Sequence, residues 1–259
     1  MSFETGLDIR WNQVSRTFVY GHGVFGPTPE HRRLDAIRAS LQDPRCAGPD
    51  PVYSIAMDVG REEHRDEFRR RMLLFGIVEY AAGQLGKEPV RSQGHVHALS
   101  PHSGWSAPEL FEIWEGRAIV YAQQHDADDP GVCVAVEANP GDLVVVPPGW
   151  AHCVINADPT SNMIFAACCD REYGFVYEGV RSHGGLAWFP VLDKHSQISW
   201  QPNPRYKASA LRQHEAREYP ELDLVGSVPI YERFSQDPES LQWVSDPAQY
   251  VSLWPSFVP

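Results

Sequence analysis

Three histidines and one glutamate are the residues of this chain whose types and spacing are best suited to chemistry. His95 and His97 lie in the segment 94–97, which reads GHVH, and His152 lies in the segment 140–156, which reads PGDLVVVPPGWAHCVIN. Glu109 lies between these two segments. Three imidazoles and one carboxylate are a ligand set for a single metal ion. The sequence therefore predicts a mononuclear metal site formed by His95, His97, Glu109 and His152.

The spacing of the histidines indicates how a β-structure would bring them together. His95 and His97 are two residues apart, so both side chains point to the same face of a strand. His152 follows a tight Pro-Pro-Gly turn at 147–149, which ends one strand and begins the next. If that face lines the inside of a barrel, the three imidazoles converge on one point near its mouth.

The ligand types narrow the choice of metal. Imidazole nitrogen and carboxylate oxygen without a thiolate suit Mn²⁺, Fe²⁺, Ni²⁺, Co²⁺ or Zn²⁺. Four protein ligands on an octahedral ion leave two positions for substrate oxygens or water, which is typical of a catalytic site. Glu112 is the alternative carboxylate, but it lies on the opposite face of a regular strand from Glu109 and is expected to be an outward-facing charge. We expect one divalent ion per chain: Fe²⁺, Mn²⁺, Ni²⁺ or Zn²⁺.

Short β runs separated by turns are expected to position these residues. They cover 52–59, 72–80, 94–99, 109–115, 117–123, 132–138, 142–147, 152–156 and 163–169. Helical patterns do not alternate with them, so the segment 51–206 is predicted to be an all-β sandwich or closed barrel.

The flanking segments differ from this β-rich middle. Residues 1–50 read as an N-terminal arm with one helix over 29–43, where Leu34, Ile37 and Leu41 recur at helical spacing. Residues 207–259 read as a C-terminal extension that packs on the barrel or forms a dimer interface.

Composition excludes several kinds of partner. The formal net charge of −12 argues against nucleic acid and anionic membranes. No run approaches the roughly 20 apolar residues of a membrane helix, and no signal peptide is visible at the N-terminus. Five cysteines without CxxC spacing are expected to be reduced and buried, which favours the cytoplasm.

The two histidine segments resemble the paired motifs of the cupin superfamily. In the second motif the matching residues are Gly141, Pro147, Gly149, His152 and Asn156, at the spacing of the superfamily. In the first motif they are His95, His97, Glu109 and Gly116, with a longer than usual separation between His97 and Glu109. The resemblance implies an all-β cupin fold, a double-stranded β-helix or jelly-roll barrel, with the N-terminal helix and C-terminal extension appended.

Residues 50–206 resemble, more narrowly, the cupin-type (archaeal-type) glucose-6-phosphate isomerases. The similar strings are DPVYSIAMDV at 50–59, GKEPVRSQGHVHA at 86–98, PPGWAHCVIN at 147–156 and NPRY at 203–206. By this resemblance His95, His97, Glu109 and His152 are the metal ligands. Ser92 and Gly94 would then contact the sugar phosphate.

The chain departs from that family at other substrate positions. Phe111 and Val78 stand where the family has hydroxyl-bearing residues, and the loop 98–108 carries an insertion. Tyr173 matches a substrate-facing tyrosine, and Arg171 is a candidate partner for an anionic substrate. The metal site therefore carries over better than the phosphate site, for which Lys87, Arg91 and Arg117 are candidates only by their position beside the motif strands.

The resemblance implies a metal-dependent aldose–ketose isomerase that acts on a small-molecule substrate, a sugar or sugar phosphate. The base would be Glu109 or a hydroxide on the metal, with His102 and Tyr173 as weaker candidates. The alternatives are another metal-dependent cupin enzyme, such as an Fe(II) dioxygenase, dehydratase or epimerase acting on a small specialised metabolite, and a non-catalytic sugar-binding cupin. A homodimer is the expected assembly.

Overall fold

A six-stranded antiparallel sheet is the largest element of this computed structural model, which describes residues 4–259. Its strands run in the order β14-β11-β16-β7-β5-β4. They are β4 (Glu30–Arg32), β5 (Tyr53–Met57), β7 (Leu73–Tyr80), β11 (Glu109–Glu115), β14 (Leu143–Val146) and β16 (Met163–Asp170).

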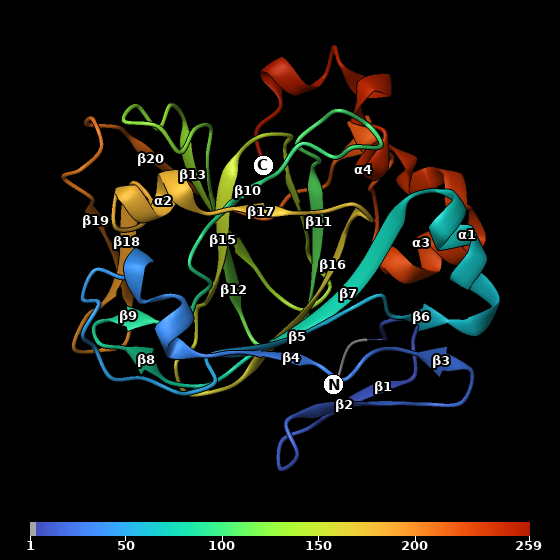
Figure 1. The fold of residues 1–259 in the computed structure, drawn as a ribbon, viewed down its shortest axis with the longest axis horizontal. Helices are drawn as coiled ribbons and strands as arrows, with labels where there is room; N and C mark the ends of the chain where they lie inside the picture. Colours follow the sequence, from blue (N-terminus) through green and yellow to red (C-terminus); the bar gives the residue numbers. More distant parts are fainter. Residues whose placement is uncertain (1–3) are drawn as a thin grey trace.

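A second sheet of four strands faces the first and completes the barrel (Figure 1). Its order is β15-β12-β13-β20, and only the β13–β20 pair is parallel among the pairs of this sheet. The strands are β12 (Ala118–Gln123), β13 (Cys133–Ala138), β15 (Ala151–Asn156) and β20 (Leu211–Glu215). The expected all-β cupin barrel is thereby confirmed.

Shorter elements surround the barrel. Five two-stranded pairs are β1 (Ile9–Asn12) with β2 (Thr17–Tyr20), β3 (Val24–Phe25) with β6 (Gly60–Arg61), β8 (Gln84–Leu85) with β9 (Glu88–Pro89), β10 (Val96–His97) with β17 (Phe175–Val176), and β18 (Trp188–Leu192) with β19 (Ile198–Pro202). The α-helices are α1 (Arg65–Arg70), α2 (Glu178–Ser182), α3 (Ile230–Gln236) and α4 (Gln242–Ser245). Within residues 4–259, no helix has the length and apolar character needed to cross a bilayer.

The main strands are buried on both faces. Every residue of β7 and of β16 is buried, because one face lines the barrel interior and the other is covered from outside. Such strands read as continuous apolar runs rather than as an alternation of apolar and polar residues. Cover on the outer face of the six-stranded sheet comes largely from the C-terminal extension.

The predicted helix over 29–43 is wrong. Residues Glu30–Arg32 form β4, which pairs with β5 and joins the main sheet. Two 3₁₀ turns follow, η1 (Leu34–Ala36) and η2 (Arg38–Ser40), whose bonds span three residues rather than four. Leu34, Ile37 and Leu41 are all buried, so their spacing did mark an inward face. Pairing with β5 and the tighter turns replace the helix that this spacing predicted.

The C-terminal extension lies against the barrel. Strand β20 continues the four-stranded sheet, and α4 packs against β7 and β16. The ring of Phe234 in α3 stacks on that of Phe68 in α1 with centroids 3.8 Å apart. In Figure 1 this red C-terminal part covers the outer side of the sheet near α1. Because β4 and β20 lie outside 51–206, the barrel draws strands from both flanking segments.

Candidate metal centre

Two short segments meet at the mouth of the barrel and carry three histidines. His97 ends β10, His95 lies just before this strand, and His152 lies in β15. His95 and His152 face each other across an antiparallel bridge, with N–H···O distances of 3.1 and 2.9 Å in the two directions. Gly149, at φ +79°, makes the preceding turn possible, because this backbone conformation favours glycine. The bridge fixes two of the imidazoles side by side.

Glu109, the first residue of β11, completes the group. One ligand atom from each of His95, His97, Glu109 and His152 lies within 4.8 Å of all the others. We call these residues the metal quartet. Oε2 of Glu109 is 3.0 Å from Nε2 of His152 and 3.3 Å from Nε2 of His97. The four side chains that the sequence singled out therefore converge on one point.

Backbone carbonyls set the orientation of two imidazoles. Nδ1 of His97 lies 2.9 Å from the carbonyl oxygen of Ala107, and Nδ1 of His152 lies 3.0 Å from that of Trp150. Since a carbonyl oxygen only accepts, both Nδ1 atoms donate, and the neutral rings present an Nε2 lone pair to the centre. This is the tautomer that metal-binding histidines adopt.

The quartet fits a metal ion. Within residues 4–259 the buried Nε2 atoms of His95 and His97 have no hydrogen-bond partner. The Nε2 lone pair of His152 and Oε2 of Glu109 are 3.0 Å apart, and two acceptors at this distance require a proton or a cation between them. A divalent cation at the centre would satisfy every one of these atoms at once.

The local pKa values of Glu109 and His95 favour the same donor set. Burial works to raise the pKa of Glu109, but the neighbouring imidazoles of His152 and His97 outweigh it, and this pKa is lowered. Burial, with the neighbouring His152 and His97, holds the pKa of His95 well below its usual value. An anionic carboxylate beside a neutral imidazole is the state in which both bind a metal.

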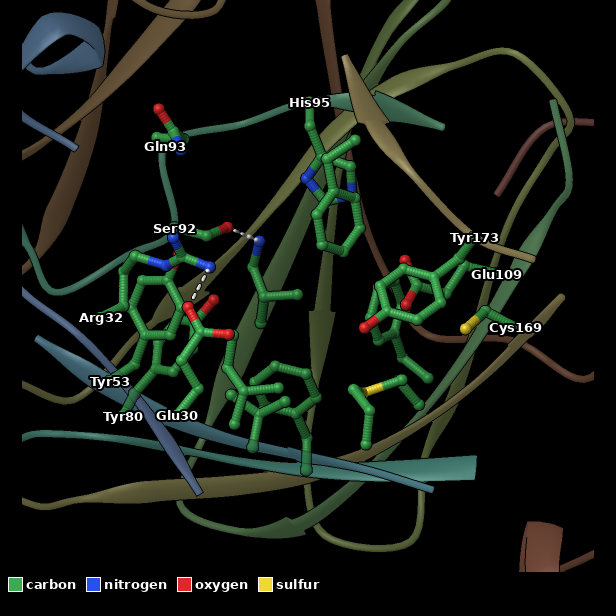
Figure 2. Close-up of a pocket in the computed structure, with 18 of the residues that line it drawn as sticks. Glu30, Arg32, Tyr53, Tyr80, Ser92, Gln93, His95, Glu109, Cys169 and Tyr173 are labelled. Atoms are coloured by element: carbon green, nitrogen blue, oxygen red, sulfur yellow. Dashed lines mark hydrogen bonds and ion pairs between the residues drawn. The ribbon is translucent and has the colours of Figure 1, made fainter. Parts of the chain in front are cut away.

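A cavity of about 300 Å³ extends from the quartet into the barrel. Its lining is mostly apolar and aromatic, with polar groups gathered at two ends (Figure 2). Figure 2 shows His95, Glu109 and Tyr173 at one end and Arg32, Tyr53, Tyr80 and Ser92 at the other. We call these last four residues the distal cluster. The volume suits a small ligand that reaches from the quartet to this cluster.

Comparison with known proteins shows the family to which this chain belongs. The profile of the glucose-6-phosphate isomerase (GPI) family matches residues 34–207, which is more than half of the chain and includes the whole quartet. The chain belongs to the glucose-6-phosphate isomerase family.

The relatives of this chain within the family are distant. It is 27% identical to glucose-6-phosphate isomerase of Pyrococcus furiosus over 189 residues, which cover 71% of this chain and 91% of that protein. It is 26% identical to the enzyme of the same name from Thermococcus kodakarensis, over 68% of this chain and 86% of that one. Among solved structures, an oxalate oxidase aligns with a TM-score of 0.30 at 19% identity, over 40% of this chain and 45% of that one.

The other substrate-contact residues that the sequence indicated do not all lie at the cavity. Ser92, Phe111 and Tyr173 line the cavity. Gly94 and Arg171 do not: Gly94 lies against Leu186, and Arg171 pairs with Asp58 at 2.8 Å.

Loop residue His102 also lies outside the cavity lining, with an exposed side chain. Among the cationic candidates, Lys87, Arg91 and Arg117 do not line the cavity. Arg91 instead forms a buried ion pair of 2.6 Å with Glu88.

Sequence reasoning missed most of the distal cluster. Arg32 was assigned to a helix in an N-terminal arm, whereas β4 places it beside Tyr53 of β5. Tyr80 lies opposite Tyr53 in the next strand. Phe175, whose ring centroid is 4.3 Å from that of His95, was also missed. Its signal was the alternation of Tyr173, Phe175 and Tyr177, three aromatic residues with two-residue spacing.

The structure corrects the expectation that Glu112 is an outward-facing charge. It points away from the cavity, yet its side chain is fully buried beneath the C-terminal extension. It accepts hydrogen bonds from Trp114 Nε1 at 2.7 Å and from the backbone N–H of Ile230 at 2.8 Å. Burial raises the pKa of Glu112 to about 7.

Proposed function

We propose that this protein is a metal-dependent aldose–ketose isomerase that acts on a sugar or sugar phosphate. The observation that carries the proposal is the convergence of the four quartet ligand atoms within 4.8 Å on the wall of a small-ligand cavity. Membership of the glucose-6-phosphate isomerase family, and relatives that bear this name, support the reaction class.

The quartet residues would hold the metal, and other groups would act on the substrate. A divalent ion bound by the quartet would supply Lewis-acid polarisation of two neighbouring oxygens of an α-hydroxycarbonyl compound. Oε2 of Glu109 lies 3.0 Å from Nε2 of His152 and 3.3 Å from Nε2 of His97. Oε1 has no protein hydrogen bond within residues 4–259. We assign to Oε1 the transfer of the proton between C1 and C2.

The groups around Glu109 would complete the reaction site. Tyr173 lines the same cavity as Glu109, and we assign to its hydroxyl the exchange of a proton with a substrate oxygen. Phe175 covers the ring of His95 and lines the same cavity, so it restricts the access of water to the quartet. We also propose that the protein is a homodimer. Analytical ultracentrifugation of the purified chain would test this assembly.

The decisive experiment is turnover by the metal-stripped protein after reloading with Mn²⁺, Fe²⁺, Ni²⁺ or Zn²⁺. Fructose and fructose 6-phosphate are offered in coupled assays that detect the aldose, and O₂ uptake is followed in parallel. We expect metal-dependent isomerisation without O₂ uptake, lost in His152→Ala and retained in the matched variant His125→Ala, whose side chain is exposed. Consumption of O₂, or stoichiometric metal binding without turnover of either sugar, would overturn the proposal.

A further inference from the structure

Strand register makes the first layer below the metal apolar. Phe111 and Val154 each lie two residues beyond a quartet residue on the same strand, so they point to the same face. Ala167 of β16 lies directly opposite Phe111. All three line the cavity. A ligand that extends from the metal therefore first meets side chains that form no hydrogen bonds.

The next layer continues this apolar wall. Phe165, Val78 and Ile55 occupy corresponding positions in three adjacent strands, β16, β7 and β5, and all line the cavity. Burying a polar group here without a partner costs free energy. The distal cluster then offers hydrogen-bonding groups again.

The distal cluster is rich in hydroxyl groups. Register places Arg32 opposite Tyr53 and Tyr53 opposite Tyr80. Burial raises the pKa of both tyrosines, so both hydroxyls keep their protons. Ser92 contributes a third hydroxyl, whose oxygen accepts a hydrogen bond from the backbone N–H of Val154 at 3.2 Å.

A single cationic side chain lines this end of the cavity, and a carboxylate is paired with it. Among the cavity-lining residues that the structure describes, Arg32 is the single lysine or arginine. Its Nη2 lies 3.0 Å from Oε1 of Glu30, which also lines the cavity (Figure 2). Nε of Arg32 is buried and has no partner within residues 4–259. The charge of the guanidinium is thus offset by Glu30, and its buried Nε offers no accessible donor to the cavity.

This arrangement suits an uncharged group better than a phosphate ester. A phosphate monoester carries about −1.5 to −2 charge at pH 7 and is bound tightly when several charge-assisted hydrogen bonds converge on it. Here Glu30 both competes for Arg32 and repels an anion. A neutral hydroxyl needs only hydrogen bonds with the neighbouring hydroxyls of Tyr53, Tyr80 and Ser92.

We propose that Glu30 is a specificity-determining residue, which pairs with Arg32 and makes the distal end of the cavity select an uncharged sugar over its phosphate ester. The inference rests on the proposed isomerase function, because it assigns the substrate class of the same site. It concerns the ligand end remote from the metal and involves no member of the quartet.

Binding of two non-reacting polyols to the Mn²⁺-loaded protein tests this inference. Titration calorimetry compares sorbitol with sorbitol 6-phosphate, in the wild type and in Glu30→Gln. We expect the wild type to bind sorbitol about tenfold more tightly than its phosphate ester, and Glu30→Gln to reverse the preference, because the variant frees Arg32 for a charge-assisted bond. Glu30 is 67% exposed in its side chain, so the substitution should leave the fold intact.

A matched variant and a second readout keep the outcomes distinct. Glu137→Gln, an exposed position in β13 outside the cavity lining, should retain the wild-type preference. Tighter binding of sorbitol 6-phosphate by the wild type, an unchanged preference in Glu30→Gln, or binding of neither polyol would overturn the inference. Turnover of fructose or fructose 6-phosphate is measured on the same samples. Isomerisation with a phosphate preference overturns the inference alone, and a sorbitol preference without isomerisation overturns the proposed function alone.

Discussion

The backbone N–H of Ile230 donates a hydrogen bond of 2.8 Å to Oε1 of Glu112. Glu112 lies three residues after Glu109 on β11, and Ile230 is the first residue of α3. The strand that carries the carboxylate of the metal quartet is therefore fastened to the C-terminal extension by a buried polar contact.

This contact predicts a pH dependence of stability. Burial raises the pKa of Glu112 to about 7, from about 4.3 in an unfolded chain. Between these values the native state binds more protons than the unfolded state, so the free energy of unfolding falls as pH rises, by about 4 kcal/mol in all, and levels off above pH 7. Glu112→Gln cannot ionise and should lose this part of the fall.

Urea unfolding at pH 5 and pH 8, in the presence of a chelator, measures the difference. Glu115→Gln is the matched control, because Glu115 lies on the same strand with an exposed side chain. Glu79, whose pKa burial also raises to about 7, contributes equally in all three proteins and cancels in the comparison. Equal pH differences in the wild type and Glu112→Gln would show that Glu112 is ionised in the native protein.

The second prediction concerns the aromatic contact between the extension and α1. Phe234 is fully buried and stacked on Phe68, so Phe234→Ala should lower the free energy of unfolding by about 3–5 kcal/mol, through lost burial and the cavity it leaves. Val251→Ala, at an exposed position in the same extension, should change it by less than about 0.5 kcal/mol. A small effect of Phe234→Ala would mean that the extension contributes little to the stability of the barrel.

The metal site was predictable from sequence because its geometry is local. The two-residue spacing of His95 and His97 and the turn before His152 place the imidazoles wherever the strands pair, and Glu109 begins a β run. The barrel followed from the same short runs. No long-range information was needed beyond the assumption that these strands share one interior.

The distal cluster was not predictable, because it depends on pairing between distant segments. Arg32 reaches the cavity only because β4 pairs with β5, and nothing in the sequence around Arg32 indicates a strand partner. Glu112 was misjudged for a similar reason. An alternating strand predicts which face a side chain takes, but not that a segment more than 100 residues later will cover that face.

The third prediction is that metal binding stabilises the fold. Metal binds the native quartet and not the unfolded chain, so a concentration 1,000 times the dissociation constant should add about 4 kcal/mol to the free energy of unfolding. Thermal unfolding followed by circular dichroism should show the melting temperature rise by several degrees when Mn²⁺ replaces EDTA. His152→Ala should abolish the rise, and His125→Ala should preserve it. An equal rise in His152→Ala would place the bound ion elsewhere on the protein.

The last prediction separates two residues that sequence reasoning offered as acid–base groups. Tyr173 lines the cavity, as Glu109 does, whereas His102 is exposed and lies outside the cavity lining. If the Tyr173 hydroxyl exchanges a proton with substrate, Tyr173→Phe should lower kcat about a hundredfold and change KM little, because the ring that packs in the cavity is retained. His102→Ala should keep kcat within about twofold of the wild type. Steady-state kinetics of the metal-loaded variants decides between them. An unchanged kcat in Tyr173→Phe would show that Tyr173 only packs in the cavity. A large loss of kcat in His102→Ala would require the loop 98–108 to bring the His102 imidazole to the substrate during turnover.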